Sequence, residues 1–248
     1  MSPSTETHDN RASASEIKFL LTPALAEQIR GWARTHLMPD PNAQGAHSDT
    51  YRITSLYFDT EQLDVFHRRG SYGRGKYRIR RYGQSELGFL ERKLRTRRQL
   101  TKRRSVVELG HLDRLTCTEP QRDWTGCWFH RRLLARKLGP LCQVSYNRTA
   151  RVAMTQHGPI RLTLDEDLCA QSADGLYFSA PGGTPICPNQ VILELKFRYA
   201  MPTLFKYLVE EFALNSQPFS KYRLAVTALN LAATALPAPI ESRIREYA

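Results

Sequence analysis

The sequence predicts an α+β fold in which a closed antiparallel eight-stranded β-barrel has helices packed outside it. Eight segments alternate polar and apolar residues with the two-residue period of a β-strand, and helical patterns lie between some of them. The apolar strand faces need cover, which amphipathic helices outside a curved sheet supply. The polar faces then point toward one another, and closing the sheet leaves a lumen between them.

Three of the predicted strands follow one another with short turns, as in an antiparallel meander, and two more form a hairpin around residues 156–158. The predicted strands are 16–21, 51–59, 75–82, 87–94, 102–108, 141–154, 159–165 and 190–197.

Helices are predicted between these strands. Thr22 and Pro23 form a helix start, with a capping residue followed by proline at the first helical position, and this helix runs to about Leu37. Further helical patterns occupy residues 60–69, most of 113–139, 201–214 and 222–235. Segments 38–49 and 171–189 are rich in proline, glycine and polar residues, and are expected to be loops.

The chain length of 248 residues suits one domain of this kind. Residues 1–15 lack the apolar core of a signal peptide and are expected to be a disordered leader, followed by a single domain over 16–236 and a tail over 237–248. No segment reaches the roughly 18 apolar residues that cross a bilayer. Any work at a membrane would therefore depend on a membrane-protein partner, while the sequence leaves the oligomeric state open.

The cysteine pattern indicates a reducing compartment. The five cysteines are an odd number and no two have CxxC spacing, so neither a zinc site nor a disulfide framework is expected. Reduced thiols favour a cytoplasmic location.

The charge balance points to an anionic partner. Lysine and arginine total 36 against 24 aspartate and glutamate, which gives a net charge of +12. Such an excess favours phosphate-rich partners, whether nucleic acid, nucleotide, polyphosphate or anionic membrane.

Cations also recur on one face of the predicted strands. In KYRIRRYG, Lys76, Arg78 and Arg80 share a strand face. An ordinary sheet with one solvated face explains any single strand of this kind. Across all strands, however, the charged faces hold the cations Lys18, Lys76, Arg78, Arg80, Lys93, Arg148, Arg161 and Lys196 against the acids Glu16, Glu91, Asp165 and Glu194. This imbalance suits phosphate binding, and the few carboxylates suit a divalent cation held between phosphates.

Common catalytic motifs are missing or misplaced. Residues 70–76, GSYGRGK, fit the first part of a P-loop, but Tyr77 replaces the serine or threonine that binds Mg²⁺, and a strand rather than a helix is expected to follow. The chain has no GxSxG and no HExxH sequence, so the signatures of serine and zinc hydrolases are missing. Nucleic acid is not expected in the lumen, because a duplex is too wide for an eight-stranded barrel.

A family resemblance rests on segments that occur in one order: EIKFLL, SLYFDT, GKYRIRRYG, GFLERKLR, KRRSVVEL, VSYNRTAR, IRLTLDEDL, VILELKF and FSKYRLA. Together they resemble the VTC domain, the polyphosphate polymerase module of the triphosphate tunnel metalloenzyme (CYTH-like) superfamily. The resemblance covers Glu16 to about Ala228. It implies a tunnel in which the γ-phosphoryl group of a nucleoside triphosphate, expected to be ATP, passes to a growing inorganic polyphosphate chain.

The resemblance also implies roles for single residues. The phosphate-binding residues at the catalytic centre are expected to be Lys18, Arg78, Arg80, Lys93, Arg148, Arg161, Lys196 and Lys221. Further substrate contacts are expected from Tyr146, Ser220, Lys76 and Lys102, with Arg103 as the alternative to Lys102. Glu194, helped by Glu16, is expected to bind a catalytic Mn²⁺ or Mg²⁺.

The sequence departs from the family pattern at its start. Of the ExExK strand usual in tunnel triphosphatases, only Glu16 and Lys18 remain, which favours one metal ion and polymerase-like chemistry. A tunnel-type phosphohydrolase acting on triphosphate or nucleotides, and a non-catalytic polyphosphate-binding module, stay open as alternatives. The basic run from Arg131 to Lys137 is either a docking surface for product or a partner, or a solvated helix face.

Overall fold

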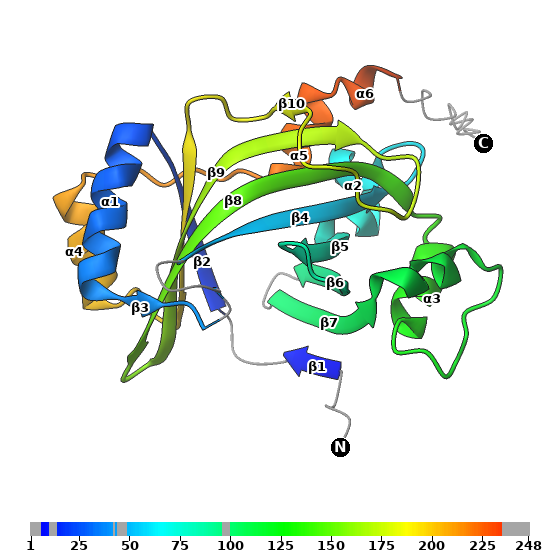
Figure 1. Ribbon diagram of the computed structural model, residues 1–248, viewed down its shortest axis with the longest axis horizontal. Coiled ribbons are helices and arrows are strands. Elements are labelled where there is room, and N and C mark those ends of the chain that lie inside the picture. Colours follow the sequence, from blue (N-terminus) through cyan, green and yellow to red (C-terminus); the bar gives the residue numbers. More distant parts are fainter. Residues whose placement is uncertain (1–5, 10–13, 42, 44–48, 96–99, 235–248) are drawn as a thin grey trace, which may run out of the picture.

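The computed structural model describes residues 6–9, 14–41, 43, 49–95 and 100–234, so the predicted tail over 237–248 lies outside the described residues. A single strongly curved antiparallel sheet dominates it, with helices on the outside at both ends (Figure 1). The predicted α+β class and its antiparallel sheet are confirmed.

All eight predicted strands are present in this sheet. Two very short strands also join it: β3 (Met38–Pro39) pairs with β8, and β10 (Thr184–Pro185) pairs with β9. The main order is β1 (Glu6–Asp9), β7 (Leu100–Glu108), β6 (Leu87–Arg95), β5 (Gly75–Tyr82), β4 (Thr50–Asp59), β8 (Gly139–Thr155), β9 (Gly158–Ser172), β11 (Val191–Arg198) and β2 (Ala14–Leu21).

The predicted closure of the barrel is not confirmed. The hydrogen-bonded path ends at β1 on one side and at β2 on the other, and no ladder joins these ends among the described residues. Side chains nevertheless reach across the opening, because Lys93 Nζ on β6 lies 3.1 Å from Glu16 Oε2 on β2. The sheet therefore curls far enough for β2, at one end, to exchange a side-chain contact with β6, two strands in from the other end.

The start of the chain differs from the predicted leader. Glu6–Asp9 forms β1, which pairs with β7 from Glu6 opposite Ser105 to Asp9 opposite Lys102, and β2 already begins at Ala14. A strand at the edge of a sheet carries unpaired backbone groups, and β1 satisfies them along β7. The sequence ETHD has no apolar alternation, so its strand character comes from the edge that it covers.

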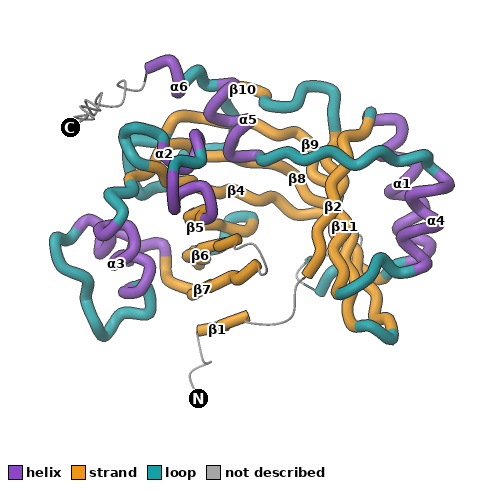
Figure 2. Tube along the Cα trace, turned by 180° about the vertical axis from the view of Figure 1, so that it is seen from behind, coloured by secondary structure: helices purple, strands orange, loops and turns teal. Residues whose placement is uncertain are grey.

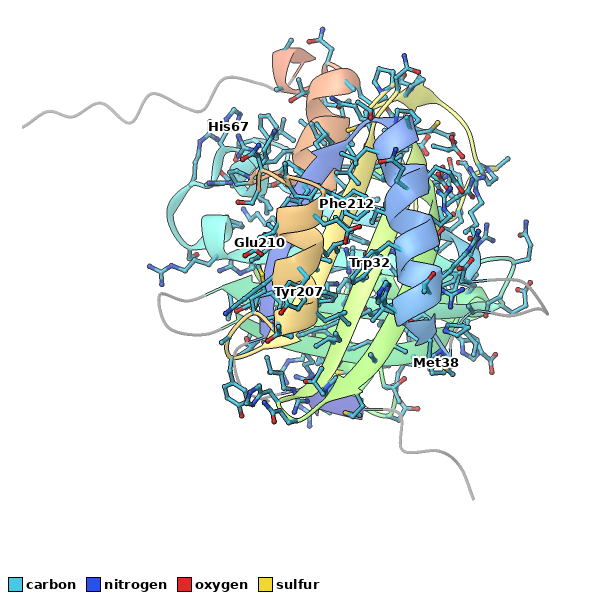
Figure 3. The ribbon with its side chains drawn as sticks, turned by 90° about the vertical axis from the view of Figure 1, so that its left-hand side faces the viewer. Trp32, Met38, His67, Tyr207, Glu210 and Phe212 are labelled. Atoms are coloured by element: carbon cyan, nitrogen blue, oxygen red, sulfur yellow. The ribbon has the colours of Figure 1, made fainter. Side chains whose placement is uncertain are left out.

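Two helices cover the outer face at the β2–β11 end. They are α1 (Pro23–His36), capped by the Thr22 hydroxyl, and α4 (Thr203–Glu211), and they lie side by side across the strands (Figure 3). An apolar layer fills the space beneath them, with Ile29, Ala33, Leu162, Leu193, Phe205 and Leu208 fully buried.

The remaining helices lie toward the other end (Figure 2). They are α2 (Asp64–His67), the 3₁₀ helices η1 (Gly70–Arg74) and η2 (Leu109–Thr116), α3 (Cys127–Ala135), α5 (Lys221–Ala228) and α6 (Leu231–Thr234). The helix predicted over 222–235 is thus broken into α5 and α6, and Asn230 at the break has a φ of 55°. The 3₁₀ helix η1 leads directly into strand β5, which agrees with the rejection of a P-loop at residues 70–76.

Specific hydrogen bonds hold α3 and α2 against the sheet at this second end. Trp128 of α3 donates its indole N–H to the Ser105 hydroxyl on β7 at 2.8 Å. The buried carboxylate of Asp59 accepts hydrogen bonds from the backbone N–H groups of Val65 and Phe66 and thereby fixes α2. None of the described helices is long and apolar enough to cross a membrane.

Candidate functional site

The inner face of the curved sheet gathers charged side chains from seven strands and from α5. Strand alternation accounts for this, because the inward residues are every second one along each strand. The side chains form two ionic clusters, each organised around buried carboxylates.

The first cluster surrounds Glu194 on β11, which is only 5% exposed. Its carboxylate oxygens lie 3.1 Å from Lys221 Nζ, 3.3 Å from Lys18 Nζ and 3.5 Å from Lys196 Nζ, with Arg148 Nη2 at 3.9 Å. Burial alone would raise the pKa of Glu194, but Lys221, Lys196 and Lys18 hold it well below its usual value. Glu194 is therefore an ionised carboxylate at the centre of a basic ring.

Glu16 on β2 extends this cluster. Its carboxylate lies 3.0 Å from Lys18 Nζ, 3.1 Å from Lys93 Nζ and 3.6 Å from Lys196 Nζ. Lys18 and Lys196 thus bridge Glu16 and Glu194. Burial lowers the pKa of Lys196 to about 8, although both carboxylates act in the opposite direction.

Asp165 on β9 completes the cluster and was not among the predicted site residues. Arg148 donates two hydrogen bonds to it, at 2.5 and 2.6 Å, and Lys221 Nζ lies 2.6 Å from the same carboxylate. Asp165 is fully buried. The signal was present in the sequence, since Asp165 shares a strand face with Arg161, but its partner Arg148 comes from another strand.

The second cluster surrounds Glu91 on β6, which is 2% exposed. Arg78 Nε donates to its carboxylate at 2.7 Å, Lys102 Nζ lies 2.8 Å away and Arg104 Nε lies 3.3 Å away. Glu91 and Arg104 were missed as site residues, and only the register of β5, β6 and β7 brings these four side chains together.

This register places Lys102, and not Arg103, on the inner face. Lys102 points inward to Glu91, whereas the guanidinium of Arg103 lies over the Trp128 ring on the outer side, 4.4 Å from its centroid.

Arg80 lies between the two clusters and is 6% exposed. It donates hydrogen bonds to the Ser55 hydroxyl and to the Tyr146 hydroxyl, each at 3.1 Å. Tyr57, next along the inward face of β4, accepts from Arg78 at 3.4 Å. Ser55 and Tyr57 were missed, although alternation along residues 51–59 places them on one face.

Lys76 and Ser220 meet at one end of the inner face. Lys76 Nζ lies 2.8 Å from the Ser220 hydroxyl, which also caps α5. Lys76 remains accessible to solvent, yet partial desolvation and the neighbouring cations Lys18 and Lys93 lower its pKa to about 7. Lys76 therefore lies where partial burial and neighbouring cations both disfavour its charged form.

Arg161 lies apart from both clusters. Its guanidinium contacts Asp40 at 2.6 Å and the Tyr51 hydroxyl at 2.7 Å. The structure therefore does not bring Arg161 into contact with Glu194.

Glu16 and Glu194, the carboxylates expected to bind Mn²⁺ or Mg²⁺, suit an ion that takes its remaining ligands from phosphate. Lys18 Nζ touches both Glu16 and Glu194, so the two carboxylates face a common point. Mg²⁺ usually takes one or two carboxylates together with substrate phosphates and water. In the described part of the chain, no group of three or more His, Cys, Asp or Glu residues is placed to hold a metal alone.

A solved structure with a TM-score above 0.5 shares this fold. A candidate adenylate cyclase from Bacillus halodurans is similar with a TM-score of 0.52 and 12% identity, over 84% of this chain and 94% of that one. A candidate adenylyl cyclase from Hippeastrum, described as having a dominant triphosphatase activity, gives a TM-score of 0.47 and 16% identity over 91% and 98% of the two chains. No curated protein matches the sequence. The VTC domain family matches residues 13–230, nearly the whole described chain, and the protein therefore belongs to the VTC domain family.

Proposed function

We propose that this chain is a metal-dependent polyphosphate polymerase, which transfers the γ-phosphoryl group of ATP to a growing polyphosphate chain on the inner face of its sheet. The observation that carries the proposal is the charge imbalance there. Inward carboxylates are Glu16, Glu91, Asp165 and Glu194. Inward cations outnumber them and include Lys18, Lys76, Arg78, Arg80, Lys93, Lys102, Arg104, Arg148, Lys196 and Lys221.

Gathering like charges in a partly desolvated space is costly unless an anion compensates them. The lowered pKa of Lys76, which follows from burial and from the neighbouring cations Lys18 and Lys93, is consistent with this cost. A chain of phosphates supplies regularly spaced negative charge, and the arginine fork matches its oxygens. The Thr163 hydroxyl, buried beside Glu194, has no hydrogen-bond partner in the described chain and could donate to such an oxygen.

The proposed reaction needs positioning and charge neutralisation more than acid–base chemistry. A terminal phosphate oxygen of the growing chain is already ionised, so no side chain has to remove a proton from it. Arg78 and Arg80 on β5 and Arg148 with Lys221 across the sheet would orient donor and acceptor and stabilise the charge on the transferred group. A divalent cation held by Glu194 and Glu16 would supply further neutralisation of phosphate charge.

The inner face would act as a tunnel when β2 is bridged to the strands on the opposite side of the curved sheet. The contact between Lys93 and Glu16 supports this closure, because it joins β6 to β2 through side chains. We assign the activity to a single domain over residues 16–236.

Incubation with ATP and Mn²⁺, followed by gel separation of the products, tests the proposal. Long phosphate chains are the expected product. Orthophosphate alone would instead identify a phosphohydrolase, and unchanged ATP together with tight polyphosphate binding would identify a non-catalytic binder. Either result overturns the polymerase assignment.

A further inference from the structure

Exposed arginines lie around α2, η1 and α3, outside the inner face. Arg68, Arg74 and Arg132 are solvent-exposed. None of the three has a side-chain hydrogen bond or ion pair within residues 6–9, 14–41, 43, 49–95 and 100–234. Both α2 and α3 lie at the end of the molecule away from α1 and α4 (Figure 2).

These arginines are continuous with the charged inner face. Arg68 is close enough to Lys76 to contribute to its lowered pKa, as do Lys18 and Lys93 inside. The chain supports the same continuity, because η1, which ends at Arg74, leads directly into β5 and Lys76. Positive charge therefore continues from the inner face to the outside at Lys76.

The C-terminal end of α3 is held against η1. Arg136 donates to the Ser71 hydroxyl at 2.9 Å, and its guanidinium lies 4.5 Å from the centroid of the Tyr72 ring. The Tyr72 hydroxyl donates in return to the Arg136 carbonyl at 3.2 Å. Arg132 lies one helical turn before Arg136 and therefore projects from the same side of α3.

Helix electrostatics favours cations at these positions without identifying their ligand. Arg74 and Arg132 lie in the last turns of η1 and α3, and Arg68 and Arg136 directly follow α2 and α3, where a cation interacts favourably with the helix dipole. The exposed guanidinium groups of Arg68, Arg74 and Arg132 are available to an external anion.

We propose that Arg68, Arg74, Arg132 and Arg136, here called the outer basic track, bind the part of a polyphosphate chain that extends beyond the inner face at Lys76. The inference rests on the proposed function and deepens it. The occupant is inorganic polyphosphate because its charges continue without interruption from the inner site. A flexible single chain can also follow cations on several elements, and each arginine that pairs with it releases counterions.

The length of the polyphosphate ligand distinguishes binding by the outer basic track from binding by the inner site. The double variant Arg74→Gln/Arg132→Gln should bind tripolyphosphate like the wild type, since this ligand fits within the inner site. It should bind long-chain polyphosphate several-fold more weakly, and the slope of log affinity against log salt should become shallower by about 1 per arginine removed. Lys206→Gln on α4 is the control, because it removes an exposed cation at the opposite end of the molecule and should change neither affinity.

Three results would overturn the proposed binding to the outer basic track. The double variant could lose affinity equally for both ligands, or lose affinity for neither. In the third, single-stranded DNA of equal charge would displace long polyphosphate from the wild type as readily as polyphosphate itself does. A wild-type protein that binds neither phosphate ligand would refute the proposed function itself, whereas tripolyphosphate binding without a chain-length effect refutes only the track.

Discussion

At the scale of single residues, Glu194 and Lys76 occupy opposite electrostatic situations on one surface. Glu194 is a buried carboxylate held ionised by Lys221, Lys196 and Lys18. Lys76 is a cation that lies near other cations, with a pKa lowered to about 7. Glu194 organises the basic ring, whereas Lys76 lies where a phosphate ligand would compensate positive charge.

Replacing Glu194 should impair catalysis more than binding. Glu194→Gln keeps the side-chain volume but removes the charge on which the basic ring and the proposed metal ion depend. We expect turnover to fall about 10²-fold or more, while triphosphate affinity changes much less. Steady-state polymer synthesis and calorimetric binding measure the two effects, and Arg80→Gln is the comparison, because it should weaken both. Wild-type turnover in Glu194→Gln would refute the role of this residue.

Phosphate affinity should depend on pH through Lys76. A lysine is charged below its pKa, so the cation at position 76 is fully present at about pH 6 and largely lost at about pH 8. Lys76→Arg remains charged throughout this range and experiences the same ionisation of the ligand. The ratio of wild-type to Lys76→Arg affinity for tripolyphosphate should therefore fall as pH rises through about 7. A ratio that stays constant would show that Lys76 does not face the ligand.

At the scale of elements, the alternation of single strands was readable from the sequence, whereas contacts that depend on register were not. The pattern in KYRIRRYG places Lys76, Arg78 and Arg80 on one face, as the structure shows. The site around Glu91 needs three strands in register, and the sequence alone could not align Lys102 with it. The predicted closure is not confirmed, and the pairing of sheet edges that it requires is likewise set by the whole sheet.

Breaks and edges were equally hard to predict. Asn230 has a φ of 55° and divides the predicted last helix, although its neighbours have ordinary helical composition. Strand β1 is polar, and its structure follows from the edge of β7 that it pairs with. Neither feature has a periodic sequence signal.

The packing of α4 on the outer face predicts a difference between two neighbouring residues. Leu208 is fully buried against the sheet, while Tyr207 is 61% exposed (Figure 3). Leu208→Ala should lower the free energy of unfolding by about 2–5 kcal/mol, and Tyr207→Ala should change it by about 0.5 kcal/mol or less. Chemical denaturation measures both values. Similar losses for the two variants would contradict this placement of α4.

At the scale of the whole molecule, part of the net charge of +12 lies where the curved sheet turns its polar face inward, because the cations there outnumber the carboxylates. The apolar layers outside provide the stability that allows this repulsive interior, and a polyanion would relieve the repulsion. The outer basic track would carry the same chemistry to the surface at Lys76.

Polyphosphate should therefore stabilise the fold. A ligand that binds only the native state adds about 2.7 kcal/mol at a concentration of 100 times its Kd. The unfolding temperature should rise with tripolyphosphate and remain lower in sodium chloride of equal ionic strength. Equal shifts with both salts would show general screening in place of a binding site.

The fate of the γ-phosphorus of ATP tests the central claim most directly. With ATP labelled at the γ position and Mn²⁺ present, the label should enter long phosphate chains, and the remaining nucleotide should be ADP. Label recovered only in orthophosphate, or left entirely in ATP, would contradict the account.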